Sequence, residues 1–303
     1  MSSLEGMSVL VTGANGFLGS AIKEELQRLK ARIVSVVWPL SEGYQRQTDT
    51  VALDLTKSTG WERLDDVDSV HAIIHCAAIL PGLLPDGDLL NKNQLMTYNL
   101  LGWGEKRKIS YFVFASTCRV YGLQSHPCVE TTPLSPPDLY TVSKISCEYM
   151  VKTMLDGKNI PSCNLRISAP YGPGSKTETV IRRFLMNSAQ GLPITLHGSG
   201  SRSQDFIYER DVARAFCMAL ASHAQGTFNL AGGESISIKE LAVKTLDLFG
   251  RDPQEYMIFS GVDAQEDYRG NFPIDAAFRS FGFHPETSIS DGLKHTAKAW
   301  GLL

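Results

Sequence analysis

The chain has 303 residues, of which 43% are hydrophobic, 20% charged and 9% aromatic, and 32 acids against 29 bases give a net charge of −3. This composition excludes a disordered chain, and the near-neutral charge offers no basic surface, so we expect no nucleic-acid partner. The sequence has no apolar run of about 20 residues, which argues against a transmembrane helix and a membrane partner.

Cysteine usage and the first residues bear on the cellular compartment. The six cysteines form no CxxC pair and no Cys/His group with metal spacing, so the sequence predicts neither a metal site nor a disulfide framework. The stretch MSSLEGMSVLVTG lacks the charged-then-apolar pattern of a secretion signal. We therefore expect a reduced, cytoplasmic protein.

The first predicted strand leads into a glycine-rich turn and a helix. Residues 8–12 (SVLVT) are a short apolar run typical of a buried parallel strand, and a second such run follows at residues 32–37. Between them, apolar residues recur with helical spacing from Phe17 to Leu29. This order of strand, turn, helix and strand is the context in which a glycine turn binds a dinucleotide.

The three glycines of this turn have separate expected roles. Gly13 makes the tight turn, Gly16 lets the backbone approach a pyrophosphate, and Gly19 lets the helix pack closely on the sheet. The helix N-terminus then supplies N–H groups and a partial positive charge for phosphates. The sequence therefore predicts a pyrophosphate site at this turn.

The spacing G-x-x-G-x-x-G, written here as TGANGFLG, resembles the extended short-chain dehydrogenase/reductase family, also called the NAD-dependent epimerase/dehydratase family. The resemblance implies an α/β fold: a Rossmann-type doubly wound parallel sheet with a smaller, interleaved C-terminal α/β substrate lobe. It places an NAD(P)-binding domain at residues 1–170, which also receives parts of residues 205–235. The substrate-binding lobe is expected at residues 171–303.

The same resemblance assigns cofactor contacts along the first domain. Asp54, at the end of a predicted third strand, matches an acid that hydrogen-bonds the adenine amino group, although a turn Asp is also common at strand ends. Two alanines end a predicted fourth strand at residues 71–78, where the cofactor passes close to the backbone, and Asn99 matches an Asn on the nicotinamide side. The predicted cofactor set is Gly13, Asn15, Gly16, Phe17, Leu18, Gly19, Asp54, Leu55, Ala77, Ala78, Asn99, Tyr140 and Lys144.

The predicted catalytic residues follow a fifth strand, expected at residues 111–116. The next segment resembles the S-S/T-x-x-V-Y-G motif of the family, and Thr117 matches its catalytic hydroxyl. Tyr140 and Lys144 form a Y-x-x-x-K pair, and residues i and i+4 share a helix face, so both side chains can point into one cleft. The Lys144 ammonium and the positive nicotinamide favour the phenolate, so Tyr140 can move a proton while Thr117 hydrogen-bonds the same substrate oxygen.

The second lobe alternates predicted strands and helices. A strand and turn at residues 165–173 open it, and the sequence from Ser237 to Glu240 is a capping box that begins a later helix. Between these two points, the pattern predicts helices at residues 180–190 and 213–221 and strands at residues 205–208 and 227–231. We therefore expect the two lobes to interleave.

Substrate phosphates call for forked hydrogen-bond donors, which arginine supplies. Residues 197–212 match the segment in which the family grips substrate phosphates, and a glycine-rich loop presents Arg202 there. For any one of the candidate arginines, a solvated surface position is an equally good interpretation. The candidate substrate residues are Ser116, Thr117, Arg182, Arg202 and Arg269, together with Arg183 beside Arg182.

Several positions depart from the family pattern. Dehydratases of the family carry Asp-Glu after the catalytic Thr, whereas this chain has Cys118 and Arg119, which disfavours a dehydratase. Ala169 and Gln204 replace an Asn and an Arg that often touch the substrate diphosphate, so the usual binding mode is in doubt. Arg202 lies two residues from Gln204 and is a candidate substitute.

The tip of the second predicted strand does not decide between NAD and NADP, and we slightly favour NAD. It reads Val37-Trp38-Pro39, without the Asp of NAD users or the Arg of NADP users. Arg46 is near enough in sequence to reach the same place. Only the cofactor class, NAD(P), follows from this part of the chain.

The stretch from Asn99 to Tyr111 is shorter than the helix that the family has there. It also contains Gly102 and Gly104, which oppose a helix. We expect either a truncated helix or a missing segment near Leu101. Because this helix often contributes to the family's dimer interface, the prediction of a homodimer depends on it.

Three functions are consistent with these motifs. The leading prediction is an NAD(P)-dependent nucleotide-sugar epimerase, in which hydride transfer passes through a keto intermediate and the partner is a small-molecule substrate. The alternative is an NAD(P)H-dependent reductase or dehydrogenase of a keto-sugar nucleotide or a small carbonyl compound. A non-catalytic cofactor-binding sensor is the third, and the presence of Thr117, Tyr140 and Lys144 argues against it.

Overall fold

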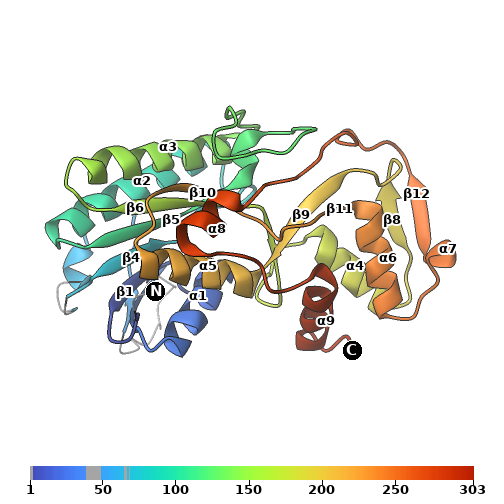
Figure 1. The fold of residues 1–303 in the computed structure, drawn as a ribbon, viewed down its shortest axis with the longest axis horizontal. Helices are drawn as coiled ribbons and strands as arrows, with labels where there is room; N and C mark the ends of the chain where they lie inside the picture. The colour runs from blue at the N-terminus through green and yellow to red at the C-terminus, as the bar shows by residue number, and fades with distance from the viewer. Residues whose placement is uncertain (1–2, 39–48, 65–66, 68) are drawn as a thin grey trace.

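A parallel sheet forms the frame of the first lobe (Figure 1). The computed structural model describes residues 3–38, 49–64, 67 and 69–303. Within these residues, seven strands pair in parallel in the order β10-β6-β5-β4-β1-β2-β3. They are β1 (Ser8–Thr12), β2 (Arg32–Val37), β3 (Thr50–Ala52), β4 (Ala72–His75), β5 (Tyr111–Thr117), β6 (Ser162–Ile167) and β10 (Gly226–Leu230).

The strand order reverses at β1. From β1 the chain builds β2 and β3 on one side, and it then crosses to build β4, β5 and β6 on the other side. Open α/β sheets bind ligands at such a reversal, beyond the carboxyl ends of the strands. The glycine-rich turn follows β1 at this point, so the topology confirms the predicted Rossmann-type sheet.

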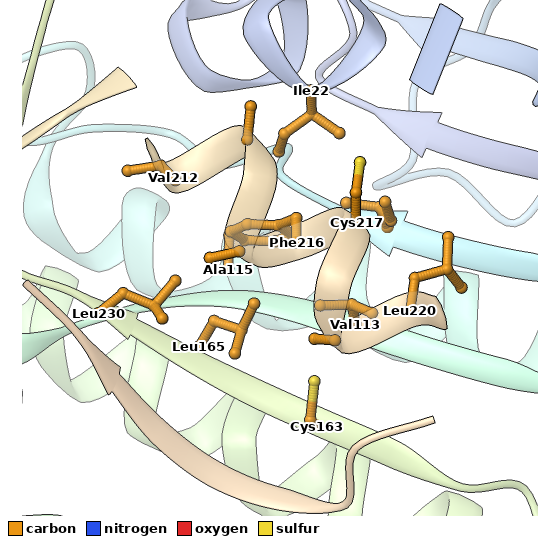
Figure 2. Close-up of a cluster of buried hydrophobic side chains, with 14 of the residues drawn as sticks. Ile22, Val113, Ala115, Cys163, Leu165, Val212, Phe216, Cys217, Leu220 and Leu230 are labelled. Atoms are coloured by element: carbon orange, nitrogen blue, oxygen red, sulfur yellow. The ribbon is translucent and has the colours of Figure 1, made fainter. Parts of the chain in front are cut away.

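One face of the sheet is covered by α1 (Phe17–Arg28) and α5 (Glu209–Ser222). Figure 2 shows Phe216 of α5 over Leu165 of β6, with Ile22 of α1 on the far side of the helix. All three side chains are fully buried. Burying a large apolar side chain contributes about 1.5–3 kcal/mol, so this packing fixes α1, and with it the turn that precedes it.

The opposite face is covered by α2 (Asp86–Lys106) and α3 (Leu139–Asp156), which pack against each other. Contrary to the expectation from propensity, Gly102 and Gly104 do not interrupt α2. A Cβ at Gly104 would lie 2.9 Å from Cδ1 of Ile109, so the missing side chain allows close packing. Tertiary contacts therefore override the low helix propensity of glycine here, and α2 ends soon after, at Lys106.

The second lobe is built on two smaller sheets, visible at the right of Figure 1. One has the order β11-β9-β7, the other pairs β12 with β8, and apolar helix faces pack between them. Among the described residues, no helix is long and apolar enough to span a bilayer. The elements are β7 (Ala169–Tyr171), β8 (Ile194–His197), β9 (Ser203–Tyr208), β11 (Ser235–Ser237), β12 (Met257–Ser260), α4 (Val180–Ala189), α6 (Ile238–Leu248), α7 (Pro253–Tyr256) and α9 (Ile289–Ala299).

The chain passes between the lobes more than once. After β9 it returns to the first lobe through α5 and β10. It returns again at α8 (Asp275–Phe281), which packs on β10 and places Ala277 and Phe281 in the core beneath α5. The two lobes are therefore tied by several crossings rather than by one linker.

A buried carboxylate lies at one of these crossings. Asp205, on β9, accepts a hydrogen bond of 2.6 Å from the backbone N–H of Gly232, just after β10. Burial raises the pKa of Asp205 to about 7, although the hydrogen bonds from Gly232 and Gly233 oppose that shift. A Cβ at Gly232 would overlap the carbonyl oxygen of Phe206, so this close approach between the lobes requires glycine.

Candidate active site

The glycine-rich turn after β1 has the geometry of a phosphate cradle. Gly13 has a φ of +65°, and a Cβ there would lie 2.9 Å from the backbone of Ala77, at the end of the neighbouring strand. Gly16 is the N-cap of α1, and no side chain caps this helix. Asn15 and Gly16 are exposed. The first-turn N–H groups are thus presented to a ligand, which fits the pyrophosphate of a dinucleotide.

A series of buried hydrogen bonds connects the ends of β1 and β4 with α2. The hydroxyl of Thr12 contacts Nδ1 of His75 at 2.7 Å and accepts a hydrogen bond from the Ala77 N–H. Nε2 of His75 contacts the Thr97 hydroxyl of α2 at 3.1 Å. Burial, and then the charge of Lys144, lower the pKa of His75 to about 3. His75 is therefore neutral at physiological pH, and it holds Ala77 and the adjoining Ala78 near the turn.

Asn93 of α2 is a site residue that sequence reasoning missed. Its side chain accepts a hydrogen bond from the Ile79 N–H (2.8 Å) and donates to the Ile79 carbonyl (3.1 Å) and to the Ser143 hydroxyl (3.2 Å). It thus clamps the loop after β4 to the helix that carries Lys144. The available signal was a buried polar residue between Leu89 and Met96, within the apolar stripe of α2.

Asn99 lies on the side of the cleft where adenine was predicted. Its amide donates to the carbonyls of Leu55 (2.9 Å) and Lys57 (3.3 Å). In the same loop, Asp54 accepts hydrogen bonds from the N–H and the hydroxyl of Thr56. In this structure the Asn99 amide therefore binds the loop that contains Asp54, and its contact on the nicotinamide side stays a prediction.

Thr117, Tyr140 and Lys144 come from two adjoining elements. Thr117 ends β5, and α3 packs against β5 and against the short 3-10 turn Cys118–Tyr121. The ammonium of Lys144 donates to the Ala115 carbonyl at 2.9 Å and lies 5.7 Å from the centre of the Tyr140 ring. The structure therefore brings the predicted cation to the tyrosine ring beside the carboxyl end of β5.

The start of α3 is fixed by a capping box. Asp138 accepts a hydrogen bond from the Thr141 N–H (2.8 Å), and the Thr141 hydroxyl reaches back to the Asp138 backbone. Asp138 also forms an ion pair with Arg119. Because Tyr140 lies in this first turn, the cap holds its backbone in place.

Ser116 points into the protein rather than into a substrate cleft. It is 4% exposed, and its hydroxyl donates to the buried carboxylate of Glu148. Neighbouring strand residues face opposite sides of a sheet, so Ser116 and Thr117 are directed differently. Direct substrate contact by Ser116, as the resemblance suggested, is not what this geometry offers.

The candidate arginines of the second lobe separate into two groups. Arg202 and Arg183 line a cavity of about 270 Å³ together with Phe184, His197 and Asp263. Nε of Arg202 lies 3.2 Å from a carboxylate oxygen of Asp263, so this arginine is held at the cavity wall.

The other two arginines have contacts elsewhere. Arg182 stacks on Trp300, with its guanidinium 4.8 Å from the ring centre, and it pairs with Glu178 at 3.7 Å. Arg269 donates to the carbonyls of Glu266 (2.7 Å) and Tyr268 (3.0 Å). In this structure both are engaged with the protein rather than directed into the cavity.

Tyr268 connects the cavity with the end of β5. Burial raises the pKa of Tyr268 to about 12, and the charges of Arg119 and Arg202 both act against this shift. The carbonyl of Tyr268 accepts a hydrogen bond of 3.1 Å from the N–H of Ser203, the residue after Arg202 of the cavity wall. The next residue, Arg269, donates its N–H to the Gln124 carbonyl at 2.9 Å. The two parts of the site therefore adjoin.

The described residues offer no group of three His, Cys, Asp or Glu side chains arranged for a metal ion. Trp38 at the tip of β2 is 52% exposed. Pro39 and Arg46, on which the choice between NAD and NADP was also argued, lie outside the described residues.

Comparison with known proteins gives a consistent set of similarities. Residues 9–231 match the NAD dependent epimerase/dehydratase family. The chain is 29% identical over 313 residues to an uncharacterized UDP-glucose epimerase of Bacillus subtilis, with 95% of this chain and 96% of that protein covered. It is 28% identical over 309 residues to UDP-glucuronate 4-epimerase of Thermodesulfobacterium geofontis, with 95% and 94% covered.

A solved structure, that of UDP-glucose 4-epimerase from Thermotoga maritima with UDP-glucose, has a TM-score of 0.86 to this chain at 22% identity. The similarity covers 97% of this chain and 99% of that one. The similarity therefore extends over both lobes, and at 22% identity it is evidence for the fold alone.

Proposed function

Because the chain belongs to the NAD dependent epimerase/dehydratase family, we propose that it is an NAD-dependent epimerase of a nucleotide sugar. One observation carries the proposal: Tyr140 and Lys144 lie on one face of α3, which packs against β5 and the turn after Thr117. The uncapped glycine turn follows β1, whose carboxyl end lies at the same edge of the parallel sheet as that of β5. The adjoining cavity with Arg183 and Arg202 supports a diphosphate-linked substrate, and the names of the two relatives support a UDP-sugar.

The residues of the chain have distinct tasks in this proposal. Tyr140 takes the proton from a sugar hydroxyl, Thr117 hydrogen-bonds the same oxygen, and Lys144 supplies the positive charge that favours the phenolate. The nicotinamide ring, when bound, supplies the hydride acceptor and donor. In this proposal, Gly13, Gly16 and the first turn of α1 hold the pyrophosphate, and Asp54 hydrogen-bonds the adenine amino group.

An epimerase fits better than a dehydratase. Elimination of water needs an acid and a base near the sugar, and the two positions after Thr117 hold Cys118 and Arg119. Burial raises the pKa of the Cys118 thiol well above its usual range, so it stays protonated. Arg119 carries the opposite charge to the carboxylate that a base would need, and it is paired with Asp138.

The direct test is to incubate the purified protein with a panel of UDP- and dTDP-sugars and to measure epimer formation and absorbance at the wavelength of reduced nicotinamide. An epimerase returns its hydride, so the expected result is an epimer without net cofactor consumption. Stoichiometric oxidation of added NADH or NADPH would instead establish the reductase. Neither product with any sugar, while Tyr140→Phe leaves the cofactor bound, would favour the sensor.

The two groups of arginines give a matched pair of variants. Arg202→Ala is expected to weaken UDP binding about 10-fold or more, because a charge-assisted hydrogen bond contributes about 1.5–3 kcal/mol and Asp263 is left unpaired in the cavity. Arg182→Ala removes the same charge from the same lobe, and we expect UDP binding within about 3-fold of wild type, since that range is under 1 kcal/mol. Calorimetric titration with UDP measures both, and equal losses would contradict the assignment of Arg202.

Three further parts of the proposal rest on separate support. NAD rather than NADP is favoured by the description of the matched family. A homodimer is supported by the apolar surface of α2, where Leu95 and Tyr98 are 45% and 57% exposed. The cytoplasmic location stays a prediction from the cysteine pattern.

A further inference from the structure

A buried ion pair lies behind the proposed catalytic residues. Glu148 of α3 and Arg166 of β6 have side chains that are each 6% exposed. The pair is bidentate, with Nε–Oε1 at 2.9 Å and Nη2–Oε2 at 2.7 Å. Burial alone would lower the pKa of Arg166, but the hydrogen bonds and charge of Glu148 raise it above its usual range. A buried pair is costly to desolvate and often adds little net stability compared with apolar packing, although removing one partner alone is destabilising. We therefore looked for a role of this pair in the position of the neighbouring residues.

Glu148 continues the face of α3 that carries the proposed catalytic pair. Tyr140, Lys144 and Glu148 are spaced by four residues and lie on one side of the helix. Lys144 donates a hydrogen bond to the Ala115 carbonyl, and Glu148 accepts one from the Ser116 hydroxyl. The two residues of β5 that directly precede Thr117 are therefore held by the helix that presents the tyrosine.

The other end of the ion pair reaches the loop that follows Thr117. Nη1 of Arg166 donates to the Tyr121 hydroxyl (3.0 Å) and to the Glu130 carbonyl (3.3 Å). The Tyr121 hydroxyl also lies 2.7 Å from the side-chain oxygen of Asn229, at the end of β10. The segment around Thr117 is thus fixed on both sides, from Ser116 and from Tyr121.

We propose that Glu148 is a positioning residue, which sets the Thr117 hydroxyl relative to Tyr140 through its hydrogen bond to Ser116 and its ion pair with Arg166. The expected effect on kcat rests on the proposed function, whereas the expected effect on the position of Thr117 does not. Catalysis loses rate steeply when reacting groups move by about 1 Å. A carboxylate that accepts three hydrogen bonds in a dry interior keeps β5 and α3 at a fixed spacing.

The test uses Glu148→Gln and Ser116→Ala. The amide of Gln turns an N–H₂ donor toward a guanidinium or a hydroxyl that needs an acceptor, whereas Ser116→Ala removes only the link to β5. We expect kcat to fall about 100-fold in Glu148→Gln and about 10-fold in Ser116→Ala. In both variants KM should stay within about 3-fold of wild type, and the amount of bound cofactor should not change. The double variant should be no slower than Glu148→Gln alone, because both act through one link.

Leu246→Ala, in the core of the second lobe, is the control for lost stability. It should lower the melting temperature and leave kcat unchanged. A fall in kcat of Glu148→Gln that is no larger than that of this control would overturn the proposal. So would a rise in KM without a fall in kcat for Ser116→Ala, because that result would make Ser116 a substrate contact.

A second measurement does not depend on turnover. The methyl resonance of Thr117, assigned with Thr117→Val in a threonine-labelled sample, should shift in Glu148→Gln and in Ser116→Ala but not in Leu246→Ala. If no sugar is turned over by the wild type, the proposed function fails while this measurement still decides the inference. A Thr117 methyl resonance that does not shift in either Glu148→Gln or Ser116→Ala would overturn the proposal.

Discussion

Replacing Tyr140 with Phe is expected to lower kcat by about 10²–10⁴-fold, the range that general acid–base catalysis supplies. The phenolic hydroxyl is the only group that the substitution removes, and the ring can stay near Lys144, whose ammonium lies 5.7 Å from the ring centre in the wild type. The capping box from Asp138 to Thr141 does not involve this side chain. We therefore expect the fold and the bound cofactor to be retained, and steady-state kinetics of epimer formation measures the loss.

Tyr149→Phe provides the matched control. Tyr149 lies on the same helix and is 63% exposed, so removal of its hydroxyl should leave kcat within about 2-fold of wild type, a difference well under 1 kcal/mol. A Tyr140→Phe variant that is as active as this control would show that another group moves the proton. Cofactor content, measured after denaturation, separates lost chemistry from lost binding.

Gly19→Ala should weaken cofactor binding and also destabilise the fold. A Cβ at Gly19 would overlap the carbonyl oxygen of Gly13, so either α1 or the turn must move. Overpacking of this kind costs about 1–3 kcal/mol. Because the displaced part is the turn that we propose binds the pyrophosphate, we expect the affinity for NAD to fall at least about 10-fold, a loss of roughly 1.4 kcal/mol in binding.

Gly102→Ala is the same substitution at a helical position with open space. Within the part of the chain that the structure describes, and apart from its neighbours in α2, no atom lies within 4 Å of a Cβ at Gly102. The alanine should therefore stabilise α2 by about 0.5–1 kcal/mol. NAD titration and urea unfolding of the two variants measure both effects. An NAD affinity of Gly19→Ala equal to that of Gly102→Ala would contradict the role assigned to the turn.

Many local elements of both lobes were predictable. The run SVLVT coincides with β1 (Ser8–Thr12), the second predicted strand coincides with β2 (Arg32–Val37), and the capping box at Ser237 begins α6. Such signals are local, because they depend on periodicity and on one turn of backbone hydrogen bonding. The pairing of β5 with β6 and of β6 with β10 also follows once the sheet type is known.

The errors and omissions have a different origin. Gly104 was read as a helix breaker, yet its lack of a side chain is what lets α2 pack beside Ile109. The hydrogen bonds of Asn99 to the carbonyls of Leu55 and Lys57 were not foreseen, because these partners lie far away in sequence. Glu148 and Arg166 carry no motif, because an ion pair between a helix and a strand has no fixed spacing.

The sequence by itself determined the glycine-rich turn after β1, the four-residue spacing of Tyr140 and Lys144, and the fold class. Each of these depends on residues a few positions apart, so the order of the chain already contains the geometry. Only the tertiary structure decided which arginine faces a cavity, that Ser116 points inward, and that Glu148 lies behind Thr117. The reason is physical: these relations join elements that folding brings together, and burial and charge become defined only when they meet.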